Sequence, residues 1–105
     1  MLARLKACLA ADRLLYTSHA RKEMRAEEFG PINEQEVYET VASGKVIEDY
    51  PDDQPYPSVL ILGYTVSLRP LHVVCAYNDE DDMAIVITVY QPDPSRWVDF
   101  RRRRQ

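Results

Sequence analysis

Hydrophobic residues near the N-terminus recur at the spacing of an amphipathic helix. Leu2, Leu5 and Leu9 fall on one helical face, which predicts a first helix within residues 1–16. The apolar stretch Leu14–Tyr16 then breaks this period. We therefore expect a helix followed by a short extended piece.

A second helix is predicted from Ser18 to about Glu28. Ser18 is its expected N-cap, because a serine oxygen can accept a hydrogen bond from an unpaired N–H group of the first helical turn. Ala20 and Met24 share one face of this helix, so we expect both in the core. The pair Gly30-Pro31 is expected to end the helical segment.

The third predicted helix, Asn33–Ser43, has the clearest start signal in the chain. Asn33 at the N-cap and Glu36 three residues later form a variant of the capping box. Val37 then faces the core. Gly44 is expected to adopt the left-handed conformation with which many helices end.

The second half of the chain has the apolar alternation of strands. The predicted strands are Val46–Tyr50, Val59–Tyr64, Leu71–Tyr77 and Met83–Tyr90. Within the third of them, one face carries Leu71, Val73, Cys75 and Tyr77, and the other carries His72, Val74 and Ala76. The last strand is apolar on both faces, so we expect it to be central in the sheet.

Prolines and polar residues mark the connections between these strands. Three prolines interrupt Ile47–Ser58, which excludes regular ladder pairing there. We expect Tyr50 and Tyr56 to pack their rings against the domain and to hold this segment in place. Thr65–Pro70 is expected to be a loop, and Asn78–Asp82 a polar hairpin turn.

Helices in the first half, followed by strands with short connections, indicate an α+β fold. We expect N-terminal helices packed on an antiparallel sheet of about four strands. The 105 residues fit one domain. Its core is expected to span about residues 16–100, followed by a basic tail at residues 101–105.

Charge is distributed unevenly along the chain. The 13 basic and 17 acidic side chains give a net charge of −4, and the body without Arg101–Arg104 carries about −8. Such a body binds nucleic acid poorly in general, because lysine and arginine supply most of the non-specific affinity for phosphate. If RNA is the substrate, a few local arginines must make the contacts.

The cysteines and the chain start indicate a cytoplasmic protein. Cys8 and Cys75 lie far apart among apolar residues, so we expect buried free thiols in a reducing compartment. The cysteines and histidines lack the spacing of a metal site, and we expect no metal or other cofactor. No apolar run reaches the roughly 18 residues of a membrane helix, and the first residues lack a signal-peptide pattern.

Several short motifs occur in an order that resembles a known prokaryotic family. They are Ser18-His19-Ala20 with Glu23-Met24, Ile47-Glu48-Asp49-Tyr50-Pro51, Arg69-Pro70-Leu71-His72-Val73-Val74, and Ile87-Thr88-Val89-Tyr90-Gln91-Pro92-Asp93-Pro94 with Trp97. That family is catalogued as a domain of unknown function and is grouped by fold with RelE-like and barnase-like toxin ribonucleases. Many of its members have an arginine where this chain has Glu23, and this chain resembles a subgroup with Glu-Met.

The resemblance implies a RelE-like fold and a toxin-type endoribonuclease of a toxin–antitoxin pair. The partners it implies are RNA and an antitoxin protein, and the oligomeric state stays open. The alternative is a non-catalytic module of the same fold that binds a protein partner. The acidic body and Glu23 favour that alternative.

Five residues could supply the chemistry of metal-independent RNA cleavage. Attack by the 2′-OH needs a base, an acid for the 5′ oxygen, and donors for the developing phosphorane charge. His19 and His72 are the acid–base candidates, and Arg69 is the candidate phosphate contact. Thr88 and Tyr90 share one face of the last strand. Each also has a structural interpretation, and whether they share one cleft depends on strand register, which the sequence leaves open.

Three further features remain, two of them after the last predicted strand and one in the proline-rich segment. Trp97 is expected to be a lid on the core. The arginine run either clamps RNA or an acidic partner, or forms a solvated, disordered end. The acids of Ile47–Ser58 would repel phosphate, so this segment is not expected to face RNA.

Overall fold

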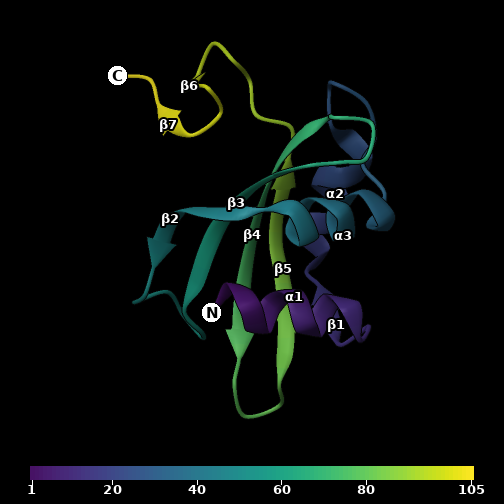
Figure 1. The fold of residues 1–105 in the computed structure, drawn as a ribbon, viewed down its shortest axis with the longest axis vertical. Helices are drawn as coiled ribbons and strands as arrows, with labels where there is room; N and C mark the ends of the chain where they lie inside the picture. Colours follow the sequence, from purple (N-terminus) through teal and green to yellow (C-terminus); the bar gives the residue numbers. More distant parts are fainter.

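A curved five-stranded sheet runs through the middle of the molecule, with helices from the first half of the chain beside it (Figure 1). The computed structural model describes residues 1–105. Its elements are α1 (Leu2–Ala10), β1 (Leu14–Tyr16), α2 (Ser18–Ala26), α3 (Glu34–Ser43), β2 (Lys45–Tyr50), β3 (Ser58–Tyr64), β4 (Pro70–Asn78), β5 (Met83–Tyr90), β6 (Trp97–Val98) and β7 (Arg102–Arg103). The predicted α+β class is confirmed.

The strands follow the order β1-β5-β4-β3-β2. The four predicted strands form antiparallel pairs, and the short piece Leu14–Tyr16 adds a fifth strand that pairs parallel with β5. The expectation of about four antiparallel strands therefore missed one parallel strand at the edge. β5 is paired on both sides, although the middle strand of the five is β4.

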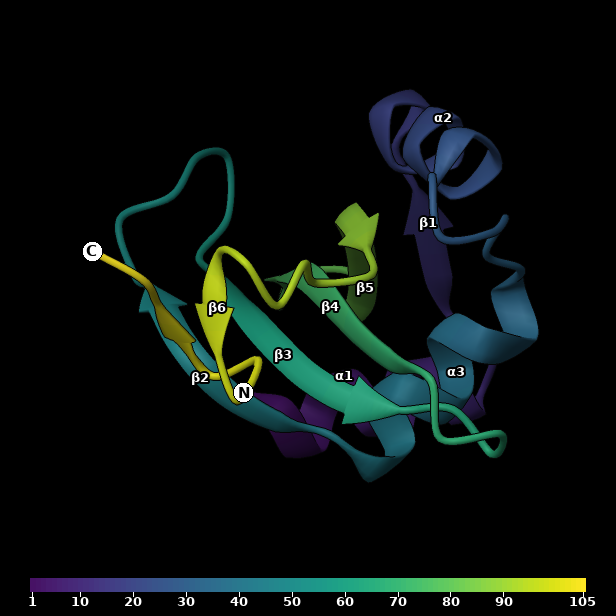
Figure 2. The same ribbon diagram turned by 90° about the horizontal axis from the view of Figure 1, so that it is seen from above.

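One continuous hydrophobic core joins the helices to one face of the sheet. Leu5 of α1, Met24 of α2 and Val37 of α3 belong to the same buried cluster as side chains from β3, β4 and β5. Leu71, Val73 and Cys75 of β4 point into this cluster, which confirms the predicted alternation along that strand. Figure 2 shows α1 and α3 on one side of the curved sheet and the C-terminal segment on the other.

The helix boundaries agree with the sequence pattern at one site and correct it at two. Asn33 and Glu36 form the predicted capping box, with both reciprocal hydrogen bonds present. The N-cap of α2 is Thr17 and not Ser18, because the Thr17 hydroxyl accepts from the N–H of Ala20 at 3.0 Å. The helix ends at Ala26, two residues before the expected limit.

Gly44 follows α3 in an extended conformation, with φ −85° and ψ 169°, so the expected left-handed conformation was wrong. The reason for glycine here is space. A Cβ atom would lie 2.5 Å from Cγ2 of Ile61 and 2.6 Å from the carbonyl oxygen of Thr40. Any other side chain would push α3 away from β3.

The C-terminal segment folds back over the sheet face that α1 and α3 leave open. Trp97 is 5% exposed, as expected for a lid, and β6 pairs with β7 in a two-stranded ribbon. The arginine run is thus partly ordered, in contrast to the disordered end considered above. Arg103 donates to both carboxylate oxygens of Glu48 on β2 at 3.0 and 3.1 Å.

Both cysteines are buried and free, as expected. Burial raises the pKa of the Cys75 thiol to about 12. Burial also raises the pKa of Cys8, so neither thiol is a reactive thiolate at neutral pH. None of the three helices has the length and apolar character needed to cross a membrane.

Candidate functional site

His72 and Tyr90 meet because β4 and β5 place them directly opposite each other. Tyr90 Oη lies 3.0 Å from Nδ1 of His72, and the carbonyl oxygen of Phe100 lies 2.6 Å from Nε2. A carbonyl can only accept, so Nε2 carries the hydrogen and Nδ1 accepts from the Tyr90 hydroxyl. Of the five candidates, these two form a direct pair.

The C-terminal segment buries this pair to different depths. His72 is fully buried, and the Trp97 ring packs edge-on against it at 4.4 Å between ring centroids. This burial lowers the pKa of His72 below its ordinary 6.5, although the Phe100 carbonyl and Glu48 act in the opposite direction. Burial raises the pKa of the half-buried Tyr90 to about 12. At neutral pH both side chains are therefore uncharged.

Stability should depend on pH through His72. Between its lowered native pKa and about 6.5, the unfolded chain binds a proton that the native protein does not, so the free energy of unfolding rises with pH. This contribution is complete above about pH 6.5 and is lost as the pH falls through the native value. Urea unfolding between pH 5 and pH 8 should give a flatter profile for His72→Gln than for the wild type. Equal slopes would contradict this assignment, and His19→Gln is the exposed control.

Tyr90 lies on the wall of an open cleft with a volume of about 720 Å³, which we call the Tyr90 cleft. Its lining residues are Glu27, Glu28, Phe29, Tyr90, Gln91, Asp93, Ser95, Arg96, Trp97, Arg103, Arg104 and Gln105. Arg103 lies over the Trp97 ring at 4.7 Å and is held by Glu48. Only Nε of Arg104 makes a hydrogen bond, to the Pro94 carbonyl oxygen at 2.9 Å. The side chain of Arg96 is exposed on the rim. The cleft thus brings three arginines together, beside the carboxylates of Glu27, Glu28 and Asp93.

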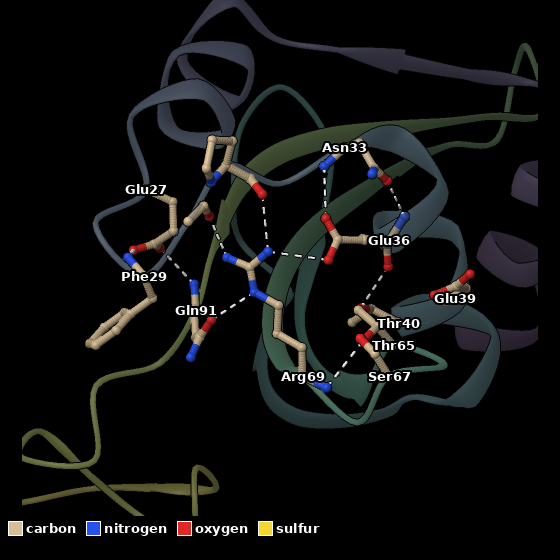
Figure 3. A network of polar contacts seen from close by, with 12 residues as sticks. Glu27, Phe29, Asn33, Glu36, Glu39, Thr40, Thr65, Ser67, Arg69 and Gln91 are labelled. Atoms are coloured by element: carbon tan, nitrogen blue, oxygen red, sulfur yellow. Dashed lines mark hydrogen bonds and ion pairs between the residues drawn. The ribbon is translucent and has the colours of Figure 1, made fainter.

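Arg69 lies behind this cleft, where its guanidinium group is almost fully occupied (Figure 3). It donates to the carbonyls of Gly30 and Pro31, to a carboxylate oxygen of Glu36 at 3.1 Å, and to Oε1 of Gln91 at 2.7 Å. Its side chain is 16% exposed. These contacts link the α2–α3 loop, α3 and the end of β5, so Arg69 holds three segments together.

His19 lies on α2, away from the buried pair. Its side chain is 66% exposed, and Nε2 lies 3.4 Å from a carboxylate oxygen of Glu23. That same oxygen accepts the N–H of Val89, and one helical turn later Glu27 accepts the N–H of Gln91 at 2.7 Å. The two glutamates thus accept hydrogen bonds from backbone N–H groups at the edge of β5, in the part of the strand that extends beyond β1. An arginine at position 23 could not accept such a bond.

Thr88 lies on the same sheet face as Tyr90 but next to a different hollow. That hollow is lined also by Tyr50, Asp52 and Asp53 of the proline-rich segment. Carboxylates at this position oppose phosphate binding, as the sequence suggested for this segment. The hollow beside Thr88 therefore carries acids and no cation, whereas the Tyr90 cleft carries arginines as well as acids.

Sequence reasoning singled out Tyr90 and the arginine run but overlooked Gln91 and Arg96. Gln91 directly follows Tyr90, and its role depends on Arg69, which is 22 residues away in the chain. Arg96 gave a weaker signal, a lone arginine between two prolines and the tryptophan. No group of three or more histidine, cysteine, aspartate or glutamate side chains is arranged to hold a metal ion.

Comparison with protein families gives one match. Residues 16–91 match the family described as Domain of unknown function (DUF4258). This range contains all five candidate residues and ends before Arg96. Searches of curated proteins and of solved structures each found no significant match. Because the match covers well over half of its 105 residues, the chain belongs to the family described as Domain of unknown function (DUF4258).

Proposed function

We propose that this protein is a metal-independent endoribonuclease of the toxin type, with a RelE-like fold and its active site in the Tyr90 cleft. The observation that carries the proposal is the Tyr90–His72 hydrogen bond on the wall of a cleft whose lining includes three arginines beside three carboxylates. Tyr90 can exchange a proton with His72, and arginines can bind a phosphate. The motif order found in the sequence supports the same reaction class.

In this mechanism Tyr90 and His72 act together as the base. Tyr90 takes the proton of the RNA 2′-OH while its own proton moves to Nδ1 of His72. The resulting imidazolium keeps its Nε2 hydrogen bond to the Phe100 carbonyl. Burial lowers the pKa of His72, so its Nδ1 is unprotonated at neutral pH and can take this proton, although the same burial makes it a weaker base than an exposed histidine. The tyrosine never has to exist as a free phenolate, which its raised pKa would oppose.

The arginines act on the phosphate. The 2′ oxygen attacks phosphorus, the bond to the 5′ oxygen breaks, and a 2′,3′-cyclic phosphate forms. Arg96 and Arg104 have N–H groups free to bind the developing negative charge. A water molecule in the open cleft protonates the departing 5′ oxygen, and His72 then returns its proton through Tyr90 to the hydroxide ion that remains.

The proposal assigns supporting positions to the other candidates. Arg69 fixes the wall of the cleft, and His19 pairs with Glu23 at the rim of α2. Thr88 lies beside acidic residues, where a phosphate is disfavoured. The reacting groups are therefore Tyr90, His72 and the cleft arginines.

The test is direct cleavage by the purified protein. Single-stranded RNA is incubated with it in excess EDTA, and new ends are mapped. Fragments ending in a 2′,3′-cyclic phosphate support the proposal. RNA that stays intact, both here and after induction of the protein in cells that keep growing, contradicts it.

A second candidate function is a non-catalytic module that binds a protein such as an antitoxin. It is favoured by two exposed apolar side chains on the β3–β4 loop, Val66 at 82% and Leu68 at 78% exposure. The loop is fixed by hydrogen bonds from Leu68 N to the Thr65 carbonyl at 2.8 Å and from Val66 N to Glu39 at 2.9 Å. Leu68 adopts a positive φ of 68°, which costs a leucine about 1–2 kcal/mol.

Leu68→Gly separates folding from binding at this loop. Glycine tolerates positive φ, so the variant should be as stable as the wild type or slightly more stable. If the loop contacts a protein partner, the same change should weaken binding about 10-fold or more, because an exposed leucine contact is lost. Thermal unfolding and titration with the protein encoded beside this one provide the two measurements. Unchanged affinity would exclude the loop from the interface.

A further inference from the structure

The side-chain amide of Gln91 has a fixed orientation at the wall of the Tyr90 cleft. Nε of Arg69 can only donate, so the group that it contacts at 2.7 Å must be the amide oxygen. The NH2 group is thereby turned away from Arg69, as Figure 3 shows. Gln91 lines the cleft, so its NH2 group is available as a donor there, while its oxygen already accepts from a cation.

Phe29 forms another part of the cleft wall and is held by the same groups. Its side chain is 46% exposed. Glu27 accepts from the backbone N–H of Phe29 at 3.3 Å and from that of Gln91 at 2.7 Å, so one carboxylate ties the two residues together. Arg69 contacts the carbonyl of Gly30, the next residue after Phe29. The aromatic face of Phe29 and the amide donor of Gln91 are therefore held in place by the same two side chains, those of Glu27 and Arg69.

We propose that Phe29 and Gln91 form a nucleobase site that prefers uracil to adenine; this rests on the ribonuclease function proposed above. Phe29 supplies a stacking face for an unpaired base, which only single-stranded RNA can present. The Gln91 NH2 group donates to a carbonyl oxygen of that base. Uracil carries two such oxygens, whereas adenine carries none.

The contact with Arg69 is what disfavours adenine. Glutamine normally recognises adenine with both halves of its amide, its oxygen accepting from N6 and its nitrogen donating to N7. Here the oxygen already accepts from a cation, so it is a poorer acceptor for the N6 amino group. Stacking alone would act in the opposite direction, because the larger purine covers more of an aromatic face. A preference for uracil thus requires the donor.

The experiment measures binding of eight-nucleotide oligouridylate and oligoadenylate by fluorescence anisotropy in EDTA. Deoxyuridine replaces the nucleotides at the cleaved positions if the oligomer is cut. Wild-type protein should bind oligouridylate about 3- to 10-fold more tightly, which corresponds to one good hydrogen bond. Gln91→Glu keeps the size of the side chain and still accepts from Arg69, but it replaces the donor with an acceptor. It should fold normally and lose this preference.

Two controls separate the outcomes. Gln54→Glu makes the same charge change on an exposed loop outside the cleft and should keep the preference for uracil. Phe29→Leu should weaken binding of both oligomers. Binding of the two oligomers with equal or reversed preference, or a preference that survives in Gln91→Glu, overturns the base site and leaves the ribonuclease intact. No binding to either oligomer overturns both proposals.

Discussion

Replacing Arg69 with methionine is expected to lower the free energy of unfolding by about 3–5 kcal/mol. In the wild type, one guanidinium group donates to the Glu36 carboxylate, the carbonyls of Gly30 and Pro31, and the amide oxygen of Gln91. The substitution leaves all four acceptors without this donor. The total free energy of unfolding of a domain of this size is about 5–15 kcal/mol, so the loss is a large part of its stability. Urea unfolding followed by far-ultraviolet circular dichroism measures it.

Arg21→Met provides the matched control. Arg21 also pairs with a glutamate on α3, Glu34 at 3.3 Å, but both side chains are exposed. Its loss should cost at most about 1 kcal/mol. If Arg69→Met is no worse than Arg21→Met, then Arg69 is not the structural link that we describe, and its role as a phosphate contact becomes the better interpretation.

Tyr90→Phe is expected to reduce RNA cleavage by about 100- to 10,000-fold. The substitution removes only the hydroxyl that bridges the 2′-OH and His72, and the ring stays in place. Nδ1 of His72 loses its donor, which costs about 1–3 kcal/mol of stability and leaves the protein folded. Initial rates of cleavage at saturating RNA measure the effect on the chemical step.

Tyr64→Phe makes the same chemical change at an exposed tyrosine at the C-terminal end of β3, outside the lining of the Tyr90 cleft. Its cleavage rate should equal that of the wild type. A Tyr90→Phe protein that cleaves RNA at the normal rate would remove Tyr90 from the mechanism. The base would then have to be sought elsewhere, with His19 as the first alternative because it is solvent-exposed.

Local signals predicted most of the fold. The Asn33–Glu36 capping box and the alternation along β4 each depend on residues a few positions apart, and both are present in the structure. β1 was not recognised as part of the sheet because its three residues pair in parallel with a strand about 70 positions later. The error at Gly44 had a similar origin, since its reason is a close approach to Ile61 on β3.

The candidate site was less predictable because its side chains have several possible partners. The sequence offered Arg69 as a free cation, but carbonyls of the α2–α3 loop and two distant side chains occupy it. His72 and Tyr90 could be named from strand patterns, and only the register between β4 and β5 makes them a pair. A charged residue thus becomes structural or functional according to contacts that lie far from it in sequence.

The glutamates of α2 have a consequence for how this protein meets other chains. Glu23 and Glu27 occupy the outward N–H groups of β5 beyond β1, so a foreign strand finds no free donors there. The opposite edge, β2, is longer and has no strand beyond it. It carries an irregularity between Val46 and Glu48, which interrupts regular pairing and discourages sheet-to-sheet aggregation. The two edges are thus protected against self-association by different means, one by carboxylates and the other by its backbone.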